Sequence, residues 1–208
     1  MGQPEYRRIA LAVTGASGLQ YGVRLLDMLL QAGNVRVSLL FSRAAHAVAA
    51  LETDWKLPAR TEELAAYFCE RFDASPDRLQ VYAREDWTAP LASGSNPPDA
   101  MVVCPCTTGT LAAIANGQSD NLIERAADVV IKERKSLILV PRETPYSAIH
   151  LEHMLKLARL GVVILPPNPG FYHRPQTAAD LVDFVVARIL DHLGVSHALM
   201  PRWGEEDK

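Results

Sequence analysis

The sequence has few cysteines, and they follow no recognised pattern. Only three of its 208 residues are cysteine, and two of these lie in the tripeptide Cys104-Pro105-Cys106. Such a set fits neither a framework of paired disulfides nor the Cys-x-x-Cys spacing of a zinc site. We therefore expect the cysteines to serve packing, in a protein that works in the reducing cytosol.

The sequence also lacks a large excess of one charge and any long apolar run. Its formal net charge is −3, so no global field would attract nucleic acid or an anionic membrane, and an anion site would need local cations. No apolar stretch approaches the roughly 18 residues of a membrane span. Residues 1–8 are polar and lead into only a short apolar run. We expect a cytoplasmic protein without a signal peptide.

The composition that is present is that of a compact globular protein. Hydrophobic residues make up 49% of the chain and charged residues 22%, which at this length provides an ample core for one domain. We expect a single domain over residues 1–208, with its core at 8–193 and a C-terminal tail at 194–208.

Short apolar runs alternate with segments of helical periodicity along the chain. Strands are expected at 8–13, 35–41, 79–82, 100–104, 136–140 and 162–165. Helices are expected at 18–32, 43–51, 61–72, 108–115, 122–134, 147–160 and 177–193. Several strands are apolar on both faces, as in a parallel sheet covered by helices on both sides. The prediction is an α/β fold with a doubly wound, Rossmann-like sheet, interrupted by a long surface excursion at 73–98.

Two turns with small and hydroxyl residues follow predicted strands, where ligands bind in open α/β sheets. The first, Thr14 to Gly18, would let a phosphate approach backbone N–H groups at a helix start. It lacks the full G-x-G-x-x-G fingerprint, so a tight turn with Ser17 as N-cap is the alternative. The second is Pro105 to Thr110. Together the two turns favour a mononucleotide or a similar phosphorylated ligand, whereas Ser42 after the second strand fits plain capping equally well.

Two cations lie seven residues apart on one predicted helix. Arg125 and Lys132 would project from nearly the same face, at about 100° per residue. Their acidic neighbours Glu124, Asp128 and Glu133 also allow an ordinary solvated ladder of salt bridges.

Further charged residues follow the last two predicted strands. Arg142 could brace a phosphate with its rigid fork of donors, and Glu143 beside it could handle a proton. A proline-stiffened loop at 166–175 follows the last strand, and Arg188 lies on the helix after it, where a surface charge is the alternative. His150 and His153 lack a third partner, so no metal site is expected. No G-x-S-x-G elbow or P-loop is present, which argues against acyl transfer and nucleotide hydrolysis.

Several motifs together closely resemble UbiX flavin prenyltransferases, formerly called aromatic acid decarboxylases, over about residues 9–193. They are Thr14 to Gly18 with Tyr21-Gly22, Cys104 to Cys106 with Gly109 to Ala112, Asp120 to Asp128, Lys132 to Arg134, Pro141 to Pro145, and Pro166-Pro167 with Phe171 to Pro175. The resemblance implies a metal-independent transferase that joins the dimethylallyl group of dimethylallyl monophosphate to N5 and C6 of reduced FMN. The prenylated FMN would pass to a UbiD-type decarboxylase, in ubiquinone biosynthesis or in aromatic acid decarboxylation. It further implies a homo-oligomer, a dodecamer in the family, with sites at subunit boundaries.

The resemblance also implies roles for individual residues. FMN would be held by Gly15, Ala16, Ser17, Ser42, Thr107, Thr108, Gly109, Thr110 and Arg142. Dimethylallyl phosphate would be held by Arg125, Lys132, Tyr172 and Arg188. The catalytic residues would be Lys132, which stabilises the departing phosphate, Trp87, which shields the allyl cation, and Glu143, Ser17 and Glu52, which manage protons.

Some readings stay open at this level. Many relatives have Ser-Met where this chain has Thr107-Thr108, so either threonine could contact the flavin. Trp87 could be an ordinary loop residue, and residues 199–203 could form an interface or a frayed tail. Two other functions compete: a phosphopantothenoylcysteine-decarboxylase-like flavoprotein with the same fold, and a non-catalytic FMN carrier.

Overall fold

The structure, a computed structural model, describes residues 6–201. Its strands are β1 (Arg7–Val13), β2 (Val35–Phe41), β3 (Leu79–Tyr82), β4 (Ala100–Cys106), β5 (Ser136–Pro141) and β6 (Val163–Ile164). Its helices are α1 (Leu19–Gln31), α2 (Arg43–Glu52), α3 (Thr61–Arg71), α4 (Thr108–Ala115), α5 (Leu122–Lys132), α6 (Ala148–Arg159) and α7 (Ala178–Leu193), with short 3-10 turns η1 (Pro76–Arg78) and η2 (Pro90–Ala92).

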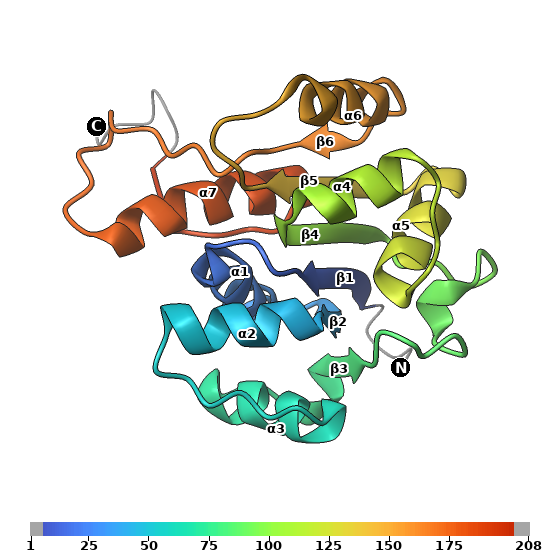
Figure 1. The fold of residues 1–208 in the computed structure, drawn as a ribbon. Coiled ribbons are helices and arrows are strands. Elements are labelled where there is room, and N and C mark those ends of the chain that lie inside the picture. Colours follow the sequence, from blue (N-terminus) through green and yellow to red (C-terminus); the bar gives the residue numbers. More distant parts are fainter. Residues whose placement is uncertain (1–5, 202–208) are drawn as a thin grey trace.

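The six strands form one parallel sheet in the order β3-β2-β1-β4-β5-β6 (Figure 1). The chain moves outward from β1 to β3, returns to the centre at β4, and then moves outward in the other direction. This confirms the doubly wound fold, and it places the topological switch point, where such sheets bind ligands, between β1 and β4.

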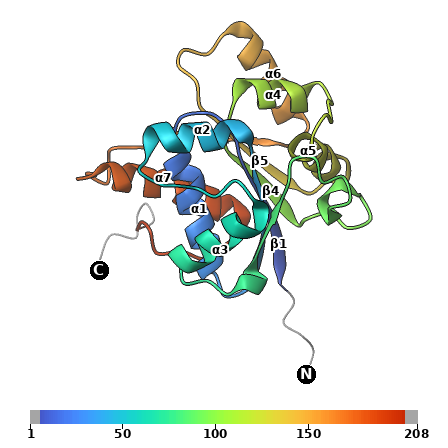
Figure 2. The ribbon, with the colours of Figure 1, turned by 60° about the horizontal axis from the view of Figure 1, so that its bottom comes forward.

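The residues of β1 alternate between two apolar cores, one on each face of the sheet. Ile9, Leu11 and Val13 belong to the core beneath α1, α2, α3 and α7, whereas Ala10 and Ala12 belong to the core beneath α4, α5 and α6. Figure 2 shows these two helix layers on opposite sides of the strands. Because both faces are covered, the central strands are apolar throughout, as the sequence pattern indicates.

The segment between β3 and β4 lies mostly at the surface, as expected, but part of it is buried. Its residues Ala89 and Leu91 are buried in the second core, against residues such as Leu40 and Met101. Helices α2 and α3 both pack on the other face, so this segment supplies the apolar cover that the sheet needs beside β2. Within the part of the chain that the structure describes, no helix is long and apolar enough to cross a membrane.

Candidate functional site

Thr14 joins the two turns at the switch point. Its hydroxyl donates to the carbonyl of Pro105 at 2.7 Å and accepts from the N–H of Thr107 at 2.9 Å, and its own N–H donates to Pro105 O at 3.2 Å. Thr14 is only 3% exposed. A single buried side chain therefore sets the spacing of the turns after β1 and β4. Sequence reasoning did not assign it a role, although a threonine that ends an apolar strand was a visible signal.

We expect Thr14→Val to destabilise the protein by about 1–3 kcal/mol, because the N–H of the half-buried Thr107 loses its acceptor and the carbonyl of Pro105 loses a donor. FMN affinity should fall as well, since the two turns lose their link. Urea unfolding and flavin titration would measure both effects. Thr14→Ser keeps the hydroxyl and should stay within about 1 kcal/mol of the wild type; an equally strong effect of serine would mean that the methyl group, not the hydrogen bonds, matters.

The turn after β1 is suited to an anion. Within residues 6–201, the backbone N–H groups of Gly15, Ala16 and Ser17 donate to no other described residue. Gly18 follows with φ 99°, a left-handed conformation that favours glycine, and serves as the N-cap of α1. Three available donors beside a helix N-terminus fit a phosphate group, as FMN carries.

Glu52 and Arg142 both contact this turn. The carboxylate of Glu52 accepts from the N–H of Gly18 at 3.0 Å and of Leu19 at 3.3 Å, so it caps α1 from the end of α2. The Nε of Arg142, just after β5, donates to the carbonyl of Ser17 at 3.2 Å. Glu143 is half-buried beside Arg142, and its Oε1 accepts from the N–H of Thr144 at 3.1 Å. The predicted flavin-binding and proton-handling residues therefore meet at one edge of the sheet.

In the turn after β4, Thr107 and Thr108 differ in the hydrogen bonds that their hydroxyls form. The hydroxyl of Thr107 caps α4, accepting from the N–H of Thr110 at 3.1 Å and contacting the hydroxyl of Thr110 at 2.9 Å. The hydroxyl of Thr108 forms no hydrogen bond with another residue between positions 6 and 201. Thr108 is thus better placed to meet a ligand. Ser42 caps α2 by accepting from the N–H of Ala45 at 3.1 Å, the capping role that the sequence allowed.

Arg125 and Lys132 form a second group, on α5. The Nε of Arg125 donates to the carbonyl of Ala92 at 2.9 Å, and a Cβ added to Gly94 would overlap Lys132 Nζ, so both cations lie against residues 92–94. The seven-residue spacing predicts this shared face. The expected ion pairs are also present, from Arg125 to Asp128 at 2.7 Å and from Lys132 to Glu133. Trp87, in the same β3–β4 connection, is 50% exposed.

Tyr172 and Arg188 form a third group. They line a cavity of about 540 Å³ between the loop after β6, helix α7 and the C-terminal segment. Tyr172 packs edge-to-face on Phe184 of α7, with the ring centroids 5.8 Å apart. Loop and helix thus place an aromatic hydroxyl and a guanidinium in one concave surface.

One chain does not bring all three groups together. Lys132 ends α5 just before the first residue of β5, whereas Arg142 follows the last. The six residues of β5 span roughly 20 Å, so the two cations lie near opposite ends of the strands, one beside their amino ends and the other beside their carboxyl ends. A ligand bound at the β1 and β4 turns could meet Lys132 only from another subunit.

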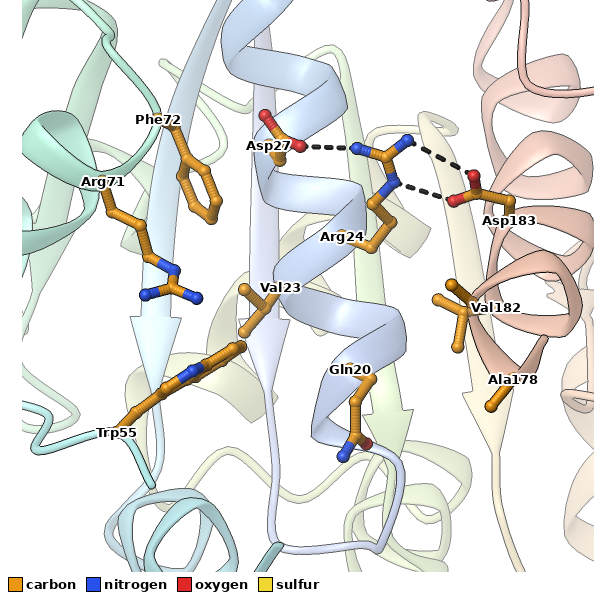
Figure 3. Close-up of a pocket in the computed structure, with 11 residues that line it drawn as sticks. Gln20, Val23, Arg24, Asp27, Trp55, Arg71, Phe72, Ala178, Val182 and Asp183 are labelled. Carbon is orange, nitrogen blue, oxygen red and sulfur yellow. Dashed lines mark hydrogen bonds and ion pairs between the residues drawn. The ribbon is translucent and has the colours of Figure 1, made fainter. Parts of the chain in front are cut away.

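A more apolar cavity, of about 450 Å³, lies between α1, α3 and α7 (Figure 3). Its charged groups satisfy one another: Arg24 pairs with Asp183 at 2.7 Å and with Asp27 at 2.6 Å, and the guanidinium of Arg71 stacks on Trp55 at 4.4 Å. It contains none of the predicted site residues and none of the free backbone donors of the turns. We therefore place the site at the switch point.

The cysteines beside the site are inert. Cys104 and Cys106 are fully buried in β4, and burial raises the pKa of both thiols, to about 12 for Cys106. Both thiols therefore stay protonated near neutral pH, which suits packing and not nucleophilic chemistry.

The fold, with free backbone donors in the turn after β1 at its switch point, is typical of a doubly wound flavoprotein. The Flavoprotein family model matches residues 2–190. The chain is 58% identical over 206 residues to the flavin prenyltransferase UbiX of Pseudomonas aeruginosa. The match covers 99% of this chain and 97% of the relative. It is 43% identical to the mitochondrial flavin prenyltransferase PAD1 of Saccharomyces cerevisiae, over 96% of this chain and 76% of that protein. The chain belongs to the UbiX flavin prenyltransferase family.

Solved structures agree with this assignment. A dodecameric FMN-dependent UbiX-like decarboxylase from Escherichia coli O157:H7 matches with a TM-score of 0.83 and 42% identity, over 94% of this chain and 98% of that one. A UbiX protein solved with FMN and dimethylallyl pyrophosphate matches with a TM-score of 0.84 and 40% identity, over 97% of this chain and 100% of that one. A PPC decarboxylase, which represents the competing phosphopantothenoylcysteine-decarboxylase class, shares only the fold. It matches with a TM-score of 0.57 and 17% identity, over 90% of this chain and 99% of that one.

Proposed function

We propose that this chain is a flavin prenyltransferase that joins the dimethylallyl group of dimethylallyl monophosphate to N5 and C6 of reduced FMN. The observation that carries the proposal is the 58% identity, over almost the whole chain, to a flavin prenyltransferase. The product, prenylated FMN, would be handed to a UbiD-type decarboxylase. We also propose that residues 1–208 form one FMN-binding domain and that the protein works in the cytoplasm.

We assign FMN binding to the switch point. The free N–H groups of the Gly15 to Ser17 turn would hold the flavin's phosphate, and the start of α4 with Thr108 would contact its other polar groups. Arg142 adds a positive charge at the same edge. These local cations and dipoles offset the negative charge that a phosphorylated, reduced flavin brings to a chain of net charge −3.

We assign the donor phosphate to Arg125, Lys132, Tyr172 and Arg188. When the allylic C–O bond breaks, the carbon fragment becomes a cation and the phosphate keeps the electron pair. Fixed positive groups aimed at the phosphate stabilise this separation of charge. The ring of Trp87 would shield the allyl cation from water through its negative face. Glu143, with Ser17 and Glu52, would carry the protons that the two new bonds displace.

These assignments require an assembly in which one chain's flavin turns meet another chain's cations. A homo-oligomer, a dodecamer as in the E. coli relative, would supply it. Helix α6 exposes two large apolar side chains four residues apart, and therefore on one face, Leu151 at 53% and Leu155 at 50%, whereas the exposed Ile149 (63%) and Leu160 (61%) lie on the opposite side of the helix. We propose that a second copy of the chain covers the face that carries Leu151 and Leu155.

Replacing Leu155 with Glu should therefore shift the protein toward smaller species, because a carboxylate would be buried without a partner at the contact. Size-exclusion chromatography with light scattering would detect the shift. Lys156→Glu, on an exposed neighbouring position, introduces the same residue and should leave the mass unchanged. An unaltered assembly of the Leu155 variant would exclude this face of α6 from the contact.

The function is tested by anaerobic incubation of the purified protein with reduced FMN and dimethylallyl monophosphate, followed by mass spectrometry of the extracted flavin. A gain of one C5H8 unit supports prenyl transfer. Unmodified FMN, recovered tightly bound with active donor present, would instead favour the carrier function.

A further inference from the structure

A chain of three side chains connects the C-terminal segment to Arg188. The guanidinium of Arg188 donates to Asp191 Oδ2 at 2.6 Å, one helical turn further along α7. The other carboxylate oxygen, Oδ1, lies 3.3 Å from Nε2 of His197. Both oxygens of Asp191 are thus engaged, one by the helix and one by the segment that follows it.

The hydrogen bonds of His197 define which of its ring nitrogens carries the proton. Its Nδ1 accepts from the backbone N–H of Leu199 at 3.3 Å, so in the neutral ring the proton resides on Nε2 and points to Asp191. The side chain of His197 is only 10% exposed, compared with 52% for Arg188. Val195 is buried in the first core and Leu199 packs against it, which anchors the segment on both sides of His197.

These three residues lie on the wall of the cavity that also contains Tyr172. Met200 and Pro201 complete the same wall, so the C-terminal segment closes one side of the space assigned to the donor phosphate. Without Asp191, a half-exposed arginine would sample many rotamers, and binding a phosphate would have to order it. With one oxygen of Asp191 held by His197, the other is presented to Arg188 in one orientation.

We propose that His197 is a positioning residue for the prenyl donor, acting through Asp191 to hold the guanidinium of Arg188 in the cavity beside Tyr172. This inference rests on the proposed function, because it takes Arg188 as a ligand of the donor phosphate. It assigns the segment after α7 a role in the site instead of leaving it as a tail.

His197→Ala in the full-length protein should raise the KM for dimethylallyl monophosphate about 3–10-fold, with kcat changed less than about twofold and flavin affinity unchanged. Calorimetric binding of dimethylallyl monophosphate to the FMN-loaded, oxidised protein should weaken by the same factor. His197→Gln, which can still donate to Asp191, should recover most of the loss. His192→Ala removes an exposed histidine of α7, next to Asp191 in sequence, and should have no effect.

Asp191→Asn provides a second test should the histidine variant fold poorly. It should reproduce the selective rise in KM, and adding His197→Ala to it should cause little further change, since both act through one contact. An unchanged KM and unchanged donor affinity in a folded His197→Ala protein would overturn the positioning role, as would strictly additive effects of the two substitutions. A wild-type protein that forms no prenylated FMN would refute the proposed function instead, so the two failures are distinguishable.

Discussion

Replacing Lys132 with Ala is expected to lower prenyl transfer by about 100-fold or more while FMN affinity stays the same, because a fixed charge at the departing phosphate acts mainly in the transition state. The side chain lies at the end of α5 against residues 92–94, far from the turns assigned to FMN. Product formation would be followed by mass spectrometry and flavin affinity by fluorescence titration. Lys135→Ala, three residues on and also exposed, should behave as the wild type.

The position of Lys132 makes the experiment informative about assembly as well. Arg142 lies about one strand length away in the same chain, so a site that contains both residues draws them from different subunits. Lys132→Ala and Arg142→Ala proteins, each inactive, should regain activity when co-expressed, and about a quarter of the sites in a random mixture would be intact. If the hybrids stay inactive while each homogeneous variant assembles, the two residues do not form a site across a contact between subunits. A Lys132→Ala enzyme with full activity would remove this lysine from the mechanism altogether.

The secondary structure could be predicted from the sequence because the signals that start and end each element lie in neighbouring residues. β2, β3 and α4 begin and end where apolar period, turn residues and hydroxyl caps place them. Most of the β3–β4 connection lies at the surface as expected, but the burial of Ala89 and Leu91 within it was not predicted, because it depends on which face of the sheet α2 and α3 leave uncovered. That choice is made by the whole fold and not by the residues of the loop.

Part of the candidate site could likewise be predicted from local sequence, and part could not. The turns at Gly15 to Ser17 and Thr107 to Thr110 were predictable, since topology alone brings the ends of β1 and β4 together. The bridge made by Thr14 and the capping of α1 by Glu52 were not, because each joins residues far apart in sequence through a specific rotamer. The proposed meeting of Lys132 with the flavin turns could not be derived from the pattern of one chain either, since it would require contacts between subunits.

Glu143→Gln should reduce product formation by about 10²- to 10⁴-fold with FMN binding retained, since an amide of the same shape cannot exchange a proton. The substitution is mild for the fold: Oε1 can still accept from the N–H of Thr144, and Arg142 keeps its bond to Ser17. The yield of prenylated FMN at fixed donor concentration is the measurement. Glu62→Gln, on the exposed first turn of α3, removes the same charge away from the site and should not alter the yield.

Comparison with Glu52→Gln separates the two carboxylates at this edge. Glu52 already accepts two backbone N–H groups of α1, and a glutamine oxygen can replace it there, so a purely structural Glu52 predicts nearly normal turnover. The carboxylate of Glu143 accepts only from its neighbour among the described residues and has the freer geometry for proton transfer. A severe loss in the Glu52 variant combined with normal yield in the Glu143 variant would reverse these roles and assign the proton to the carboxylate at the N-terminus of α1.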